Sequence, residues 1–415
     1  MTNFEKLKNT INASENTIVE LQTLLTSVPA IAPESGGDGE LKKCIVLEEY
    51  LKKLGFSNFQ RLDAPDPRVS SGLRPNLIVT IPGKYYKTEN DSVVWIMAHL
   101  DVVPPGELKS WNSDPWKVVY DKESGKLIGR GVEDNQQGLT AGVLAAYSLI
   151  KNNIIPEKTV KLLFMADEEF GSTYGIKFLL KNHKSIFSNK DIILIPDGGD
   201  SKGETIEIAE KNILWLKVLT KGQQSHGSMP HKGVNAHLAA CKLALSLNDL
   251  ENFFAKQDDL FDPPYSTFQP TKKENNVQTV NIIPGEDIFY MDCRILPCYT
   301  LEEVRKELNI RCKKIETEFN VKIELEELQA EQSPATSPNS EVVKLLSQAI
   351  KDSHNIESKT IGIGGGTVGA CLRNEGFEAA IWSTMDEVCH QPNEYCFIEN
   401  IIKDATTLAC LFLIK

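Results

Sequence analysis

Carboxylate and imidazole side chains stand at the ends of three apolar runs, VVWIMAHLD, LLFMADEEF and IILIPDGGD. Imidazole nitrogens and carboxylate oxygens without cysteine suit Zn²⁺, Co²⁺ or Mn²⁺ in a catalytic site better than a structural zinc site, which favours thiolates. A carboxylate beside such ions could also move a proton during hydrolysis. The residues concerned are His99, Asp101, Asp167, Glu168, Glu169 and Asp197.

Two further segments carry the same residue types. Asp134 lies in GRGVEDNQQG at a predicted strand-to-helix turn, and His390 lies in TMDEVCHQPNE before the last predicted helix. Each position has a structural alternative. Asp134 and Asp197 could cap helices, the acidic pair Glu168 and Glu169 could begin a solvated helix, and His390 could be a plain loop histidine.

The apolar runs predict the strands that must position these residues. They alternate with amphipathic helical stretches, which indicates an α/β fold with a largely parallel sheet. Ligands bind beyond the carboxyl ends of strands in such sheets, so the three strand ends would meet at one rim. The predicted strands cover 91–101, 160–169 and 191–199, and the helices between them cover 135–152 and 173–183.

The pattern changes from about Ile208 and the α/β alternation resumes near Ser333. The intervening elements follow the order β-α-β-β-α-β, which is typical of a ferredoxin-like domain. The sequence therefore predicts a catalytic domain at 1–210 and 331–415, with a smaller domain inserted at 211–330. The inserted strands are predicted at 214–222, 278–286, 287–297 and 321–328, and the helices at 235–250 and 300–319.

Composition narrows the class of protein. The chain has 415 residues, 25% of them charged, and a net charge of -12, which argues against nucleic acid or an anionic membrane as the main partner. The N-terminal segment lacks the apolar core of a signal peptide, and no apolar run is long enough to span a membrane. The nine cysteines include no C-x-x-C pair, so we expect reduced, mostly buried thiols and a cytoplasmic protein.

Six motifs occur in a specific order along nearly the whole chain, followed by the late His390: HLD, GRGVEDNQQG, ADEEFGS, PDGG, SHGSMPHKGVNA and VNIIPG. In this order they resemble the dinuclear-zinc peptidase and deacylase family. That family contains succinyl-diaminopimelate desuccinylase, acetylornithine deacetylase, aminoacylase, glutamate carboxypeptidase and the cytosolic dipeptidases. The resemblance implies a phosphorylase/hydrolase-like catalytic domain with an inserted dimerisation and lid domain.

The resemblance also implies a ligand set for two divalent metal ions, zinc first and cobalt or manganese as alternatives. Asp134 would bridge both ions. His99 and Asp197 would complete one metal site, and Glu169 and His390 would complete the other. Of the remaining acids, Asp101 would orient the His99 ring through its other nitrogen.

Further roles follow from the same resemblance. Glu168 would be the general base that takes a proton from the attacking water and passes it to the leaving amine. His226 would stabilise the oxyanion in the partner subunit's active site, so the protein would be a homodimer. Arg294 would bind a substrate carboxylate, and Asn281 would also contact the substrate.

The glycine-rich turn GGGTVG at 364–369 allows two interpretations. It satisfies the spacing G-x-G-x-x-G of a dinucleotide site, but in the resembled family such a turn lines the substrate pocket, and we assign Gly365 to substrate binding on that basis. This turn lacks an acidic residue often found after the threonine, and NQQG follows Asp134 where many relatives have a Met-Lys-Gly-type stretch. Because of both departures, the substrate specificity of any one relative is a weaker guide to the substrate of this chain.

The expected function is metal-dependent hydrolysis of an amide bond next to a free carboxylate. A small peptide is the preferred substrate class, and an N-acyl amino acid, as for a deacetylase or desuccinylase, is the alternative. A catalytically dead binding protein on the same scaffold is the alternative from another class. Loss of a metal ligand or of Glu168 would favour the dead binding protein, but the sequence retains Glu168 and every expected metal ligand.

Overall fold

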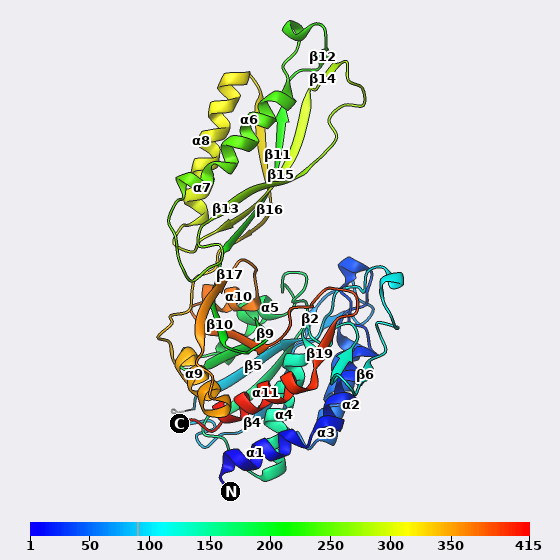
Figure 1. The fold of residues 1–415 in the computed structure, drawn as a ribbon, viewed down its shortest axis with the longest axis vertical. Coiled ribbons are helices and arrows are strands. Elements are labelled where there is room, and N and C mark those ends of the chain that lie inside the picture. Colours follow the sequence, from blue (N-terminus) through cyan, green and yellow to red (C-terminus); the bar gives the residue numbers. More distant parts are fainter. Residues whose placement is uncertain (89–90) are drawn as a thin grey trace. The chain divides into compact units, whose positions relative to one another are not determined.

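The computed structural model describes residues 1–88 and 91–415, which divide into two compact units (Figure 1). The first unit comprises Met1–Ile208, Thr336–Thr360 and Thr367–Lys415, and the second comprises Ala209–Ala335 and Ile361–Gly366. Residues 361–366, expected in the first domain, lie in the second unit because their backbone bonds to it. The amide of Gly362 donates to the carbonyl of Leu260 at 2.6 Å, and the amide of Lys211 donates to the carbonyl of Ile363 at 3.0 Å.

An eight-stranded sheet forms the centre of the first unit, in the order β1-β4-β8-β5-β9-β18-β10-β17. The four central strands, β8, β5, β9 and β18, run parallel, so the predicted α/β class is confirmed. β1, β4 and β10 pair antiparallel with their neighbours. The strands are β1 Phe59–Arg61, β4 Leu77–Ile81, β5 Val93–His99, β8 Thr159–Met165, β9 Ile192–Asp200, β10 Thr205–Glu210, β17 Lys359–Ile363 and β18 Ala379–Thr384.

Helices cover both faces of this sheet (Figure 1). On β5, Trp95 and Met97 belong to the core shared with α5 and α10, whereas Ile96 packs against Gly142 of α4 on the opposite face. This alternation follows from the two-residue period of a strand, and it explains why the central strands are mostly apolar. The helices are α1 Asn3–Asn12, α2 Glu15–Thr26, α3 Leu41–Lys53, α4 Gln136–Asn152, α5 Ile176–His183, α9 Glu341–His354, α10 Val368–Asn374 and α11 Ile398–Leu411.

Two small sheets complete the first unit. β19 Tyr395–Phe397, β7 Lys126–Ile128 and β6 Val119–Asp121 form one of them, and β2 Ala64–Pro65 pairs with β3 Leu73–Arg74 in the other. Of the nine free cysteines, six are buried, and the exposed ones are Cys241 and Cys298. No helix within the described residues is both long and apolar enough to cross a bilayer.

The second unit is a four-stranded antiparallel sheet in the order β13-β15-β11-β16, with α6 and α8 packed on its apolar face. This is the ferredoxin-like arrangement that the sequence predicts. A two-stranded extension, β12 with β14, projects from it (Figure 1). The elements are β11 Asn212–Lys221, β12 Ser225–His226, α6 Ala236–Asn248, α7 Leu250–Phe253, β13 Thr267–Lys273, β14 Ile282–Ile283, β15 Glu286–Ile295, α8 Leu301–Phe319 and β16 Lys322–Glu331.

The strand predicted at 278–286 is wrong for most of its length. Within it, only Ile282–Ile283 and Glu286, the first residue of β15, are in strands, and Val280 is fully exposed. The second long strand of the domain is instead β13, Thr267–Lys273, which pairs with β15. Its sequence, TFQPTKK, is mostly polar and contains Pro270, which only an edge strand tolerates, so the usual apolar signal is missing.

Candidate metal centre

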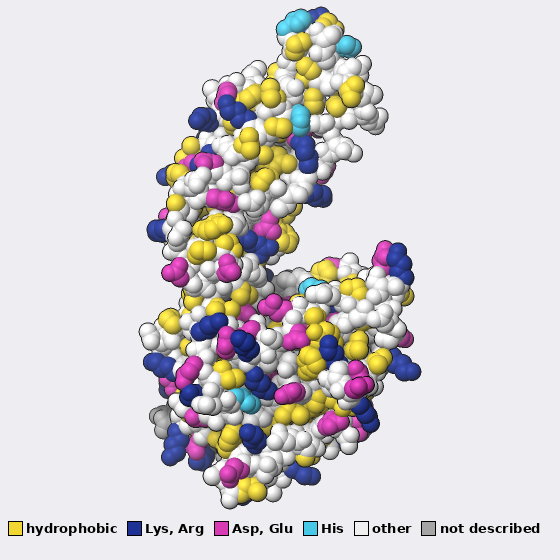
Figure 2. Space-filling view, viewed as in Figure 1, with side chains coloured by type: hydrophobic (Ala, Val, Ile, Leu, Met, Phe, Trp, Pro, Cys, Tyr) yellow, Lys and Arg dark blue, Asp and Glu magenta, His cyan; other side chains and the backbone are white. Residues whose placement is uncertain are grey.

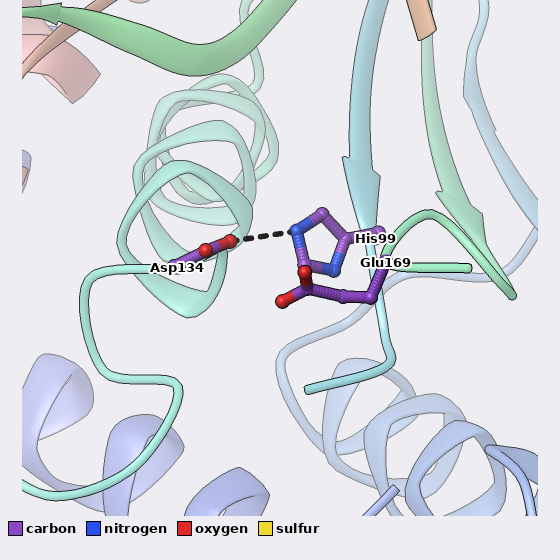
Figure 3. Close-up of side chains that lie close together, drawn as sticks. All are labelled: His99, Asp134 and Glu169. Carbon is purple, nitrogen blue, oxygen red and sulfur yellow. Dashed lines mark hydrogen bonds and ion pairs between the residues drawn. The ribbon is translucent and has the colours of Figure 1, made fainter. Parts of the chain in front are cut away.

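One strand end and two loops bring an imidazole and two carboxylates together at the end of the central strands (Figure 3). His99 is the last residue of β5, Asp134 precedes α4, and Glu169 follows β8. The Nε2 atom of His99 lies 2.8 Å from Oδ1 of Asp134. One ligand atom from each of the three residues lies within 4.8 Å of the others, which is close enough for one metal ion to be held between them.

His390 joins this group from a segment far away in the sequence. Its Nε2 atom lies 3.0 Å from Oδ2 of Asp134 and 3.1 Å from Oε2 of Glu169. Asp134 therefore faces His99 with one carboxylate oxygen and His390 with the other. A carboxylate placed between two such imidazoles has the arrangement that a bridging ligand requires.

A second group of ligand atoms overlaps the first. His99, Glu168 and Asp197 also place one atom each within 4.8 Å of one another, and Nε2 of His99 lies 3.7 Å from Oδ1 of Asp197. The two groups share His99, so the strand ends form one continuous cluster. Glu168 and Asp197 both belong to this group, and membership in it therefore does not distinguish a ligand from a base at this position.

Asp101 fixes both the His99 ring and the loop that follows β8. The Nδ1 atom of His99 lies 2.9 Å from the backbone carbonyl of Asp101 and 3.5 Å from its carboxylate. The carboxylate of Asp101 instead accepts hydrogen bonds from the backbone amides of Glu168, at 3.1 Å, and Glu169, at 3.0 Å. With Nδ1 bonded to an oxygen, Nε2 of His99 is left to bind a cation.

The cluster holds more negative charge than its imidazoles offset. Burial raises the pKa of Asp197 to about 7, with a further upward contribution from Asp134 and Glu169. Burial and the Asp197 carboxylate raise the pKa of Glu168 well above its usual range. Hydrogen bonds to Asp134 and Glu169 raise the pKa of His390 to about 10. Crowded carboxylates that resist ionisation are stabilised when a cation lies between them.

One atom of the cluster indicates directly that a cation fits. Oε1 of Glu169 is buried and has no hydrogen-bond partner among the described residues. A buried carboxylate oxygen without a donor is costly, and a divalent cation would satisfy it. The donor set of nitrogen and oxygen atoms also suits zinc, cobalt or manganese.

Glu394 holds the turn that carries Asp134, a role that the sequence does not indicate. Its buried carboxylate accepts from the backbone amides of Gly131 at 2.9 Å, Glu133 at 3.0 Å and Asp134 at 3.1 Å. It also forms an ion pair with the buried Arg130 at 2.6 Å. All the donors that Glu394 satisfies therefore lie in the turn before α4.

Glu133 makes the reciprocal connection to the loop that carries His390. Its carboxylate accepts from the backbone amides of Asp386 at 2.8 Å and Val388 at 2.6 Å. Each loop thus provides a buried glutamate that binds the backbone of the other, and we call Glu133 and Glu394 the glutamate latch. Glu394 follows His390 within the same motif, but an acid in a loop is usually solvated, so the sequence does not signal the latch.

In the second unit, His226 and Asn281 lie together on the β12–β14 extension. The amide of Gly227 donates to the carbonyl of Asn281 at 2.7 Å, and the amide of Ser228 donates to Nδ1 of His226 at 3.1 Å. With Nδ1 accepting, the ring proton of a neutral His226 lies on Nε2. His226 is exposed, and Figure 2 shows histidine and hydrophobic side chains gathered on the surface at this end of the unit.

Arg294 and the glycine turn lie together elsewhere in the second unit. The guanidinium of Arg294 donates to Asp292 through Nε at 2.7 Å and Nη2 at 3.1 Å, and to the carbonyl of Gly364 through Nη1 at 2.8 Å. Gly365, next along the turn, is exposed. The structure therefore brings the predicted substrate residues Arg294 and Gly365 together, with Asp292 holding the guanidinium in place.

Comparison with known proteins finds matches over most of the chain. Residues 95–413 match the model of peptidase family M20/M25/M40. An uncharacterized metallohydrolase of Methanococcus maripaludis is 40% identical over 93% of this chain and 96% of its own length. Succinyl-diaminopimelate desuccinylase of Nautilia profundicola is 25% identical over 93% of this chain and 96% of its own length. The structure of the dipeptidase Dug1p from Saccharomyces cerevisiae superposes with a TM-score of 0.75 at 16% identity, covering 99% of this chain and 98% of that one.

Proposed function

The chain belongs to peptidase family M20/M25/M40, and from this membership we propose that it hydrolyses an amide bond of a small peptide, next to a free carboxylate. The observation that carries the proposal is the pair of overlapping ligand groups that share His99, with Glu168 beside them. Such a cluster suits two divalent cations and one carboxylate free to move a proton. The ferredoxin-like unit then supplies the residues that bind substrate.

Five side chains would hold the two cations. Asp134 faces both imidazoles, and we assign it to both ions. His99 and Asp197 complete one site, and Glu169 and His390 complete the other. Bound there, divalent cations supply polarisation of the scissile carbonyl and a lower pKa for the attacking water.

Glu168 moves the proton. Its carboxylate takes a proton from the attacking water and delivers it to the nitrogen of the leaving amine, so that a neutral amine departs. Two features support this role. Burial and Asp197 raise the pKa of Glu168, which favours a group that must both accept and release a proton. The backbone amide of Glu168 donates a hydrogen bond to the carboxylate of Asp101, which fixes the direction in which the Glu168 side chain leaves the backbone.

A substrate panel tests the proposal. The protein is stripped with a chelator and reloaded with Zn²⁺, Co²⁺ or Mn²⁺, then given dipeptides, tripeptides, acetyl-amino acids and succinyl-diaminopimelate. We expect the stripped protein to be inactive and the reloaded protein to cleave peptides. Cleavage of the acyl-amino acids instead would show a deacylase, the alternative favoured by the desuccinylase relatives. A folded protein that takes up no metal and cleaves nothing would indicate a binding protein on a dead scaffold.

We also propose a homodimer in which His226 serves the active site of the partner subunit. Its support is the position of the residue: His226 lies exposed on an extension, with a proton available on Nε2 for an oxyanion. Arg294, held by Asp292, keeps further N–H donors for a substrate carboxylate. Asn281 lies beside His226, and Gly365 lies beside Arg294. These two residues complete the proposed substrate contacts.

Mixing two inactive variants tests whether His226 acts across the dimer. We expect His226→Ala and Glu168→Ala each to be nearly inactive, with metal content unchanged. After subunit exchange, half of the dimers are mixed and each has one intact site, so activity should recover to about a quarter of the wild-type turnover. The mixture should stay inactive if His226 serves its own subunit, and size-exclusion chromatography with light scattering reports the dimer separately.

A further inference from the structure

The second unit contains a cysteine, a histidine and an aspartate in contact with one another. Cys241 and His237 are one helical turn apart on α6, and Asp287 lies on β15. The sulfur of Cys241 is 3.7 Å from Nε2 and 3.9 Å from Nδ1 of His237, so it lies against the ring. Nδ1 of His237 is 2.8 Å from Oδ2 of Asp287. None of these residues belongs to the metal centre.

Asp287 orients the imidazole. Its carboxylate is buried. It also accepts hydrogen bonds from the side-chain amide of Asn276, at 2.7 Å, and from the ammonium of Lys273. Because Asp287 accepts from Nδ1, the neutral ring of His237 carries its proton there, and Nε2 keeps a free lone pair. A nucleophile, a base and an acid that orients the base form the arrangement by which proteins activate a thiol.

A pocket of 280 Å³ opens beside the thiol. Its walls include the apolar side chains of Ala240, Ala244 and Phe289, together with Lys273, whose ammonium is paired with Asp287. Cys241 lines this pocket and is exposed. The pocket therefore offers an apolar surface next to a sulfur that solvent can reach.

We propose that Cys241 is a thiol–disulfide exchange site for a small disulfide. The side chain of Cys241 rotates toward Nε2 of His237 and gives it the thiol proton. The thiolate attacks one sulfur of the disulfide, a new sulfur–sulfur bond forms to Cys241, and the original one breaks. The departing thiolate takes up the proton from His237, so the exchange is balanced without a further oxidant.

Cys298 is the matched control within the same unit. It is also exposed, and within residues 1–88 and 91–415 its side chain makes no hydrogen bond. Any difference in rate between the two cysteines therefore reports the surroundings of Cys241 rather than solvent access or oxidation state. The proposal is independent of the amide hydrolysis, because no residue in it touches the metal centre.

The test measures mixed-disulfide formation on the full-length, metal-loaded protein with oxidised glutathione at pH 7, by mass spectrometry of the two cysteine peptides. We expect Cys241 to react about tenfold faster than Cys298, and His237→Gln to remove that advantage. Circular dichroism shows whether that variant is folded.

Two results would overturn the proposal. Equal rates at Cys241 and Cys298 would mean that the neighbouring imidazole has no effect. An unchanged rate in folded His237→Gln would exclude His237 as the base.

Discussion

Replacing Glu168 by alanine should lower turnover by about 10²–10⁴-fold while both metal ions stay bound. The reason is that a proton-transferring carboxylate acts in the transition state, whereas the five proposed ligands remain intact. Binding of substrate should change little, so the loss should appear in kcat rather than in KM. Metal content by mass spectrometry and steady-state kinetics on the same samples measure both effects.

Glu169→Ala is the matched control, because it removes the neighbouring carboxylate, which contacts His390 at 3.1 Å. That variant should lose one metal ion together with its activity. Glu168 also lies in the group with His99 and Asp197, so a metal ion missing from Glu168→Ala would identify Glu168 as a ligand instead. Turnover close to that of the wild type would exclude both roles.

Replacing Glu394 by alanine should destabilise the protein by about 3–5 kcal/mol, because it leaves the buried Arg130 without its ion-pair partner. The same change removes the acceptor of three backbone amides in the turn that carries Asp134. A released turn no longer holds its ligand, so metal affinity should fall by about 10–100-fold. Urea unfolding of the metal-free protein and calorimetric metal titration measure the two effects separately.

Glu399→Ala provides the comparison, since Glu399 lies exposed in the first turn of α11, only a few residues from Glu394. Its stability should change by less than about 0.5 kcal/mol and its metal affinity should not change. If Glu394→Ala lost stability but kept full metal affinity, the latch would support the fold without positioning Asp134. A variant with unchanged stability would contradict the buried ion pair itself.

The latch has a physical consequence for the metal centre. Asp134 and His390 lie far apart in the sequence, and loops with many polar groups are usually mobile. Here, the backbone of each loop donates to a buried glutamate of the other. A cation held by both loops, as we propose, would therefore meet ligands already in position, which would reduce the ordering cost of binding.

The parts of this protein that depend on local pattern could be predicted from its amino-acid sequence. Apolar runs ending in His99, Glu168 and Asp197 predicted strands, and the central strands are parallel in the structure. Strand periodicity and the rule that ligands bind beyond strand ends are local or topological, so they predicted that these residues would share one rim. The order of motifs was sufficient for the family, which the family match confirmed.

Features that depend on pairs of distant residues could not be predicted before the chain was seen folded. β13 is polar and exists because it pairs with β15, and the Asp287 carboxylate meets His237 only after that sheet has formed. Glu394 reaches Gly131 across 263 positions of the chain. A buried polar group is stable only when its partners are in place, and those partners belong to other segments, so no local pattern in the sequence encodes them.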